Sequence, residues 1–302
     1  MPTPEDRQPE EPESPAPPVT VVILTLDEEV NLPDALASCA WCDDVHLVDS
    51  GSSDRTVAIA EAALGPGHTH HHAFESFGKQ RNWAIEHVPA KHDWVFHLDA
   101  DERFTPALVE ELHRRLTASP RGAEQLDAFR CPHRMMMHGT WLRRSEGYPV
   151  YQVRLFHRRR MRFIDAGHGQ REHPDARLGT LDEPYLHEAY RRGIADWVAR
   201  HNVHSQKEAE ALLAAEREGG APGLLGCFSA DRTRRRRALK HWSWKLPGRP
   251  WLRWFTILFL QRGVLDGPAA WHYAGLMKLY DEMTGVKLRW LRRAGSGPAG
   301  EP

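Results

Sequence analysis

Cysteine and long apolar runs are both scarce in this sequence. Four cysteines among 302 residues are too few for a disulfide scaffold, and the one C-x-x-C pair, Cys39 and Cys42, has no partner pair at zinc-site spacing. We therefore expect reduced thiols. No run reaches the ~18 apolar residues that a membrane-spanning helix needs. The sequence has no positively charged start followed by an apolar segment, so we expect no signal peptide.

An excess of positive or negative charge is missing as well, and so are glycine-rich phosphate loops. Lys and Arg number 40 against 41 Asp and Glu, for a net charge of -1, so bulk charge predicts no nucleic-acid partner. Neither G-x-G-x-x-G after the first apolar run nor G-x-x-x-x-G-K-[ST] occurs. A nucleotide bound by this chain would need a metal and basic side chains to hold its phosphates.

Strand and helix patterns alternate four times in the first 100 residues. Continuous β-branched or apolar runs predict strands at Val19–Thr25, 44–49, 68–72 and 93–99, and helical spacing predicts helices between them. This order is typical of an α/β fold with a mostly parallel, Rossmann-like sheet and helices on both faces.

Polar clusters follow three of these strands, at 25–28, 49–54 and 99–102. The carboxyl ends of parallel strands share one edge, so we expect the clusters to line one crevice. Asp99 and Asp101 are two apart in extended backbone and point the same way, which suits a hard divalent ion such as Mg²⁺. Lys79 and Arg81 precede this strand. Taken alone, the acidic stretch fits a solvated turn better than a metal site.

Four segments together resemble family 2 glycosyltransferases of the GT-A fold, in particular the bacterial lipopolysaccharide inner-core glucosyltransferase group. They are VVILTLDEE (21–29), VDSGSSDRT (48–56), FGKQRNWA (77–84) and VFHLDADER (95–103). Asp27 departs from the pattern, because related sequences usually have Asn there, and so does the histidine-rich third strand.

The resemblance implies an enzyme with a nucleotide-sugar donor and Mg²⁺ or Mn²⁺. The nucleoside pocket would be lined by Thr25, Glu28, Asp49 and Asp54. Lys79 and Arg81 would approach the diphosphate, and Asp99 and Asp101 would form the DxD pair that binds donor and metal. In an inverting transfer, a metal on the leaving diphosphate stabilises the developing charge.

The general base should lie downstream of the metal motif. Strands are predicted at 128–131 and Val150–His157, with a loop at 135–141 between them. Arg154-Leu155-Phe156 matches a strand of the relatives, and Glu172 follows it where relatives carry an acid. We expect Glu172 to be the base and Glu188 to be the second candidate. Each could instead be an ordinary surface carboxylate.

Two other features have alternative readings. The histidines at 68, 70 and 72 could share one face of a strand, but without an interleaved acid a solvent-facing edge strand is favoured over a metal site. The C-terminal part predicts a helix at 194–218, a basic run at 232–237, an aromatic helix at 251–260 and a helix at 266–280. Basic and aromatic residues together favour contact with an anionic membrane, ahead of core packing and far ahead of RNA binding.

We therefore expect four regions: an acidic, proline-rich disordered tail (1–18), a GT-A catalytic domain (19–192), a helical extension (193–290) and a disordered tail (291–302). The expected function is metal-dependent inverting transfer of a hexose, glucose from UDP-glucose, to a lipid-linked saccharide such as lipopolysaccharide core. The expected location is cytoplasmic, peripheral on the inner membrane. The alternatives are transfer to another glycolipid or exopolysaccharide, and a non-catalytic, membrane-bound sugar-nucleotide-binding protein.

Overall fold

The computed structural model describes residues 16–118, 125–166, 169–217, 223–244, 246 and 248–294. Its first part has the predicted alternation of strands and helices. The elements are β1 (Val19–Thr25), α1 (Leu32–Ser38), β2 (Val45–Asp49), α2 (Thr56–Leu64), β3 (Thr69–His71), α3 (Phe77–His87) and β4 (Trp94–Asp99). The strand β1 has the bounds expected from its β-branched run.

The main sheet is mixed, with a parallel half and a largely antiparallel half. Its order is β3-β2-β1-β4-β8-β6-β12-β5, and β7 and β11 also pair with β6. Strands β3, β2, β1 and β4 run parallel, and β8 joins β4 antiparallel. The later elements are β5 (Glu102–Arg103), α4 (Pro106–His113), η2 (Arg114–Ala118), β6 (Ala128–Met137), β7 (Thr140–Trp141), β8 (Val150–His157), β9 (Phe163–Ala166), β10 (Gly169–Glu172), β11 (Leu178–Thr180) and β12 (Tyr185–His187).

Helices cover both faces of the parallel half because β1 is apolar on both sides. Val21 and Ile23 pack in one buried cluster with residues of α1, α2 and α4, whereas Val22 packs in another with Ala84 and Ile85 of α3. Successive strand residues point to opposite faces, so a continuous apolar strand needs a helical layer on each. The expected GT-A-like α/β class is confirmed.

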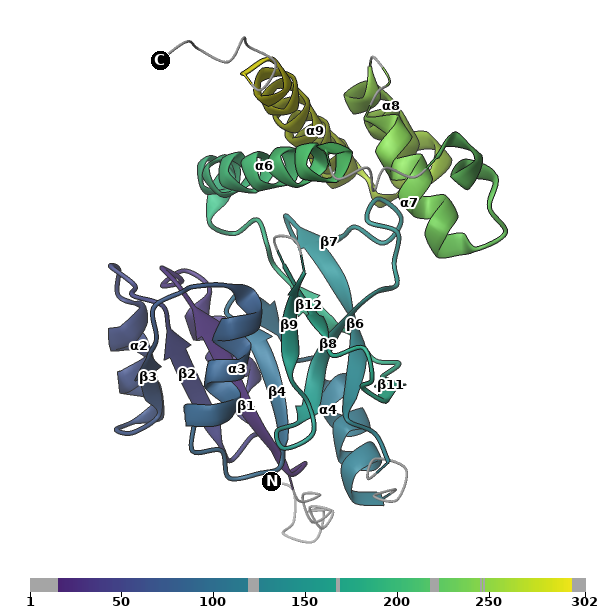
Figure 1. Ribbon diagram of the computed structural model, residues 1–302. Helices are drawn as coiled ribbons and strands as arrows, with labels where there is room; N and C mark the ends of the chain where they lie inside the picture. The colour runs from purple at the N-terminus through teal and green to yellow at the C-terminus, as the bar shows by residue number, and fades with distance from the viewer. Residues whose placement is uncertain are drawn as a thin grey trace, which may run out of the picture.

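The C-terminal helices form a layer beyond one end of the sheet (Figure 1). They are α6 (Gly193–Arg217), η3 (Leu224–Phe228), α7 (Arg232–Ser243), α8 (Arg249–Phe255), η4 (Thr256–Leu260), η5 (Gly263–Asp266) and α9 (Pro268–Ala294). Met137 and Leu142, at the tip of the β6–β7 hairpin, share a buried cluster with Trp197 of α6 and with α9. Asp266 also accepts hydrogen bonds from the backbone amides of Arg144 and Ser145, both 2.8 Å long.

Several predicted boundaries differ from the structure. The segment 135–141, expected as a loop, belongs to β6 and β7, which pair across a tight turn at His138 and Gly139. Both of these residues have positive φ, 50° and 72°, a backbone state that the hydrophobicity pattern does not reveal. The last helix is longer than expected and includes residues 291–294 of the predicted tail. Residues 1–15 and 295–302 of the two tails lie outside the described part. Among the described helices, none combines the length and apolar character needed to cross a bilayer.

Candidate active site

The parallel strands bring three predicted site residues to one edge of the sheet. In the sheet register, Thr25 of β1 lies beside Asp49 of β2, and Leu24 of β1 lies beside Asp99 of β4. Thr25 Oγ1 is 3.3 Å from Asp49 Oδ1. Asp49 Oδ2 accepts hydrogen bonds of 2.9 and 3.0 Å from the amides of Gly51 and Ser52, which closes the small-residue turn around it.

Two loops at this edge are tied together by carboxylates. Asp54 Oδ2 accepts a 3.0 Å hydrogen bond from the Glu29 amide, and Asp27 Oδ1 accepts one of 2.7 Å from the Ser53 amide. Burial alone would raise the pKa of Asp54, but the hydrogen bonds from Thr56 and from the Glu29 amide hold it below its usual value. Asp27 has a φ of 54°, in the left-handed region that Asn and Asp tolerate best. The departure from Asn at this position therefore preserves the backbone shape.

Asp99 is held between two buried guanidinium groups. Arg81 Nη2 lies 3.1 Å from Asp99 Oδ1, and Arg154 Nη2 lies 2.7 Å from Asp99 Oδ2. Burial would raise the pKa of Asp99, yet Arg154 and Arg81 outweigh it and hold the pKa well below the usual range. Asp99 is therefore ionised at neutral pH and fixed in direction.

Glu102 supports Asp99 and Arg154 from the protein interior. Its side chain is fully buried, it forms an ion pair with Arg154, and its Oε2 accepts a 3.0 Å hydrogen bond from the Asp99 amide. Burial, opposed by Arg154, raises the pKa of Glu102 to about 7. A fully buried carboxylate of this kind positions Asp99 and Arg154, and no acceptor hydroxyl can reach it directly.

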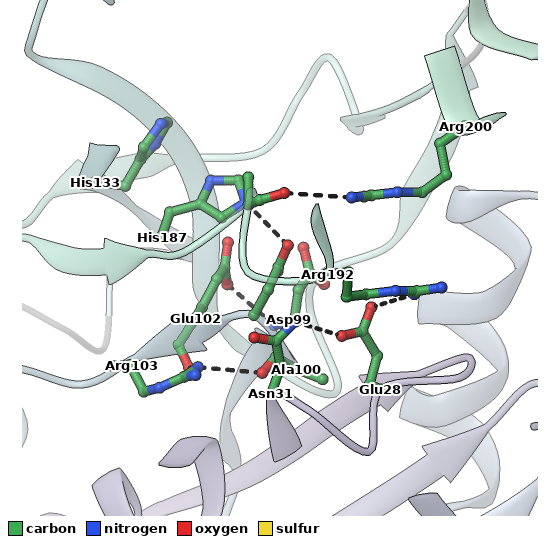
Figure 2. A network of polar contacts seen from close by, with 12 residues as sticks. Glu28, Asn31, Asp99, Ala100, Glu102, Arg103, His133, His187, Arg192 and Arg200 are labelled. Carbon is green, nitrogen blue, oxygen red and sulfur yellow. Dashed lines mark hydrogen bonds and ion pairs between the residues drawn. The ribbon is translucent and has the colours of Figure 1, made fainter. Parts of the chain in front are cut away.

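Asp101 has a histidine partner that the sequence pattern did not single out. His187, on β12, places its Nε2 3.4 Å from Asp101 Oδ2. Burial would lower the pKa of His187, but Asp101 outweighs it and raises this pKa to about 9. Figure 2 shows His187, Asp99 and Glu102 gathered in one network.

Glu28 joins the same network from the β1–α1 loop. Arg192 Nη1 donates to Glu28 Oε1 at 2.9 Å, and Asn31 Nδ2 donates to Oε2 at 2.7 Å (Figure 2). Burial, partly offset by Asn31, raises the pKa of Glu28, and the negative charge of Asp101 raises it further. Glu28 and Asp101 therefore repel each other electrostatically.

A cleft of about 700 Å³ opens beside the network. Its walls include Arg81, Asp99, Glu172 and His187, so Glu172 of β10 shares a cavity with the DxD segment. Glu188 is attached through its backbone, whose amide donates to the Asp101 carbonyl oxygen at 2.7 Å. Glu188 is half-buried and is not part of the cleft wall.

Lys79 lies apart from the other predicted residues. It is exposed in the first turn of α3 and forms a 2.7 Å ion pair with Glu75. Positions two apart on a helix lie about 200° apart around its axis, so Lys79 and Arg81 face different ways. In this conformation only Arg81 enters the site.

The donor atoms at this edge fit a hard divalent cation. Asp99 and Asp101 offer carboxylate oxygens, the ligands that Mg²⁺ and Mn²⁺ prefer, and Asp99 lines the open cleft where a diphosphate could complete the coordination. Within the described residues, the one group of three ligating side chains whose donor atoms lie within 4.8 Å of one another is elsewhere, at Asp44, His46 and His68.

Residues with no assigned role in the sequence pattern hold much of this site. They are Arg154, His187 and Arg192, which contact Asp99, Asp101 and Glu28 respectively. Arg154 stood inside a predicted apolar strand, and a buried arginine there is the one signal that predicts a buried carboxylate partner. Nothing in local spacing indicates that His187 and Arg192 lie opposite acids more than 80 residues away.

The comparisons with known proteins agree with these motifs. The model of glycosyl transferase family 2 matches residues 20–168. A lipopolysaccharide core biosynthesis glycosyltransferase, LpsC, from Rhizobium meliloti is 31% identical over 156 residues, which are 51% of this chain and 53% of that protein. A TPR repeat-containing protein from Synechococcus elongatus is 37% identical over 99 residues, 32% of this chain and 24% of its own. The chain thus spans about half or less of the length of these relatives.

Solved structures with a similar chain course include S. aureus TarS 1–349 in complex with UDP. It is 16% identical, with 91% of each chain covered and a TM-score of 0.41. Glucosyl-3-phosphoglycerate synthase from Mycobacterium tuberculosis, in complex with Mn²⁺ and UDP-glucose, is 20% identical, with 43% of this chain and 46% of that one covered and a TM-score of 0.31.

Proposed function

Through residues 20–168 the chain belongs to glycosyl transferase family 2, and from this we propose that it is a metal-dependent inverting hexosyltransferase. The donor would be a UDP-hexose, in particular UDP-glucose, and the acceptor a lipid-linked saccharide such as lipopolysaccharide core. The observation that carries the proposal is the convergence of Asp99, Arg81, His187 and Glu172 on one cleft, beside Asp101.

The nucleoside end of the donor would lie over the carboxyl ends of β1 and β2. Thr25, Glu28, Asp49 and Asp54 there supply hydroxyl and carboxylate oxygens, which accept hydrogen bonds from ribose hydroxyls and from the N–H of a uracil ring. Arg81 would face the diphosphate, and Lys79 would reach it only by leaving Glu75. These roles follow the family's motifs and the shared edge of the sheet.

Asp99 and Asp101 would hold the divalent cation. When bound, the cation supplies charge stabilisation to the leaving diphosphate. The two arginines around Asp99 keep it ionised and oriented, and His187 orients Asp101. Because the pairing with Asp101 raises the pKa of His187 to about 9, a cation that binds Asp101 competes with the imidazolium for this carboxylate.

Glu172 would take the proton from the attacking hydroxyl of the acceptor, because it faces the same cleft as Asp99. Glu188 is the second candidate, since its backbone amide bonds to the Asp101 carbonyl oxygen and keeps it beside the metal segment. Catalysis would reside in residues 19–192.

The helical extension, residues 193–290, would hold the enzyme on an anionic membrane, on its cytoplasmic face, where a lipid-linked acceptor is displayed. The name of the R. meliloti relative supports a lipopolysaccharide core acceptor. Another glycolipid or an exopolysaccharide is the alternative acceptor. A non-catalytic sugar-nucleotide-binding protein is the alternative function.

A donor-hydrolysis assay with a panel of nucleotide sugars tests the proposal. We expect release of UDP from UDP-glucose that requires Mg²⁺ or Mn²⁺. Asp101→Asn should lower the rate about 10²-fold or more, as for loss of a main electrostatic stabiliser. Asp93→Asn is the matched control, because Asp93 is an exposed surface acid paired with Arg159.

The outcomes separate the alternatives. Turnover that survives both EDTA and Asp101→Asn would exclude the metal-assisted mechanism. Binding of UDP-glucose without turnover, under conditions where an acceptor extract is supplied, would favour the non-catalytic alternative.

A further inference from the structure

A second cluster of ligating side chains lies at the opposite edge of the sheet from the candidate active site. Asp44 and His46 stand at the start of β2, and His68 directly precedes β3. One donor atom from each lies within 4.8 Å of the others. Asp49 is five positions after Asp44 along an extended strand, so the cluster is about 16 Å from the carboxyl edge.

Two of the three ligands are already at coordination spacing. Asp44 Oδ1 and His46 Nε2 are 3.1 Å apart. Tetrahedral zinc ligands at bond lengths of 2.0–2.1 Å are about 3.4 Å from one another. The ring of His68 stacks on that of His46 with 4.7 Å between centroids, and its side chain is half-buried.

The surrounding hydrogen bonds orient each ligand. His68 Nδ1 lies 2.8 Å from the Val45 carbonyl oxygen. A carbonyl only accepts, so Nδ1 carries the proton and Nε2 keeps its lone pair for a cation. Asp44 Oδ2 accepts hydrogen bonds from Thr20 Oγ1 at 2.5 Å and from the Lys91 amide at 2.8 Å, which leaves Oδ1 for coordination. Metal-binding histidines and carboxylates in proteins usually have such supports.

His70 supplies the remaining support. Its Nε2 is 3.2 Å from His46 Nδ1. Because Asp44 accepts, His46 carries its proton on Nε2, and a cation at that atom requires the proton on Nδ1 instead, where His70 Nε2 can accept it.

We propose that Asp44, His46 and His68 form a binding site for Zn²⁺ that is separate from the cation site proposed at Asp99 and Asp101. Two imidazoles and one carboxylate suit zinc, with water as the fourth ligand, whereas the carboxylates at Asp99 and Asp101 suit Mg²⁺ or Mn²⁺. The site would pin β3, an edge strand of only three residues, to β2. If present, it would replace the sequence-based expectation of a solvent-facing edge strand for the histidine run.

The test uses the full chain, freed of metal with a chelator and titrated with Zn²⁺ by calorimetry in millimolar Mg²⁺, which occupies the hard-cation site. We expect one zinc per chain and a rise in melting temperature on zinc addition. His68→Gln, chosen because His68 is half-buried, should weaken zinc binding at least about tenfold, since even loss of a supporting residue costs that much, and should abolish the thermal shift.

Two variants serve as controls. His71→Gln removes an exposed histidine from the same strand and should leave zinc binding unchanged. Asp101→Asn should also leave it unchanged, because it alters the other edge. The proposal fails if the unmodified chain takes up no zinc, if His68→Gln binds it as tightly as the unmodified chain, or if Asp101→Asn is the variant that loses it.

Discussion

At the scale of single residues, the site depends on how its acids are held. Asp99 is ion-paired with Arg81 and Arg154 on opposite oxygens, and Glu102 anchors Arg154 from the protein interior. Removing either arginine would take away one of the two positive charges that hold this half-buried carboxylate, which is costly. Glu172, like Asp99, lines the open cleft, whereas Glu102 is fully buried.

The identity of the base is tested by Glu172→Gln. We expect turnover to fall by about 10²-fold or more while the dissociation constant for UDP-glucose stays nearly unchanged, because proton removal matters only in the transition state. Stopped-assay rates and calorimetric donor binding measure the two quantities. Glu188→Gln is the matched comparison. If it abolishes turnover and Glu172→Gln does not, Glu188 is the base and the assignment is wrong.

At the scale of elements, the pair α6 and α9 builds the helical layer. Lys287 of α9 donates to the carbonyl and side-chain oxygens of Asn202 on α6, and Arg292 pairs with Glu216. Inside this layer, His201 stacks on Trp197 at 3.7 Å and donates to the Trp197 carbonyl oxygen at 2.8 Å. Burial, opposed by that hydrogen bond, lowers the pKa of His201 to about 4.

This pKa makes the helical layer sensitive to acid. In the unfolded chain His201 has a pKa of about 6.5, so between pH 6.5 and 4 the unfolded state binds more protons. Its contribution to stability is complete above pH 6.5 and is lost as the pH falls toward 4. Between pH 7 and pH 4, the unfolding free energy of His201→Phe should therefore fall by on the order of 1–2 kcal/mol less than that of the unmodified chain, a figure that allows for the partial exposure of His201.

Urea unfolding at several pH values measures this difference. His87→Phe on α3 is a close control, since His87 also stacks on a tryptophan four residues earlier, Trp83, and bonds its carbonyl, but is exposed. Equal acid sensitivity in His201→Phe and the unmodified chain would contradict the prediction.

At the scale of the whole molecule, the helical layer carries an exposed apolar surface, which we call the aromatic face. Its members are large apolar side chains that are at least 44% exposed: Trp251, Leu252, Phe255, Phe259 and Leu260. Leu258, in the same segment, is fully buried in a cluster with residues of α9, so part of this segment packs as core. The backbone of 232–237 is helical. Arg235, which is exposed, is the one arginine of this run whose side chain is described.

The aromatic face and the basic run predict binding to anionic vesicles. Each Arg near an anionic leaflet contributes about 1 kcal/mol, and exposed charges are screened within about 10 Å at 0.1 M salt. Vesicle sedimentation should therefore show binding that weakens steeply with ionic strength. Replacing the arginines at 234–237 with Gln should weaken binding, and so should Trp251→Ala combined with Phe255→Ala, while donor hydrolysis changes little.

The control replaces four exposed arginines remote from the helical layer with Gln, and it should bind vesicles normally. These are Arg114, Arg159, Arg162 and Arg177. Equal binding to neutral and anionic vesicles, or none to either, would rule out the electrostatic anchor.

The sequence by itself determined the parallel half of the sheet and the edge on which its polar residues gather. Periodicity and β-branched runs are local, and parallel strands necessarily end on one side, so Thr25, Asp49 and Asp99 could be placed together without coordinates. Only the tertiary structure decided which partners face them. Arg154, His187 and Arg192 reach the acids through the antiparallel strands and the start of α6, and such long-range pairings leave no local periodicity. The Asp44–His46–His68 cluster was hidden for the same reason, because its ligands come from two strands whose register is set by the sheet and not by spacing along the chain.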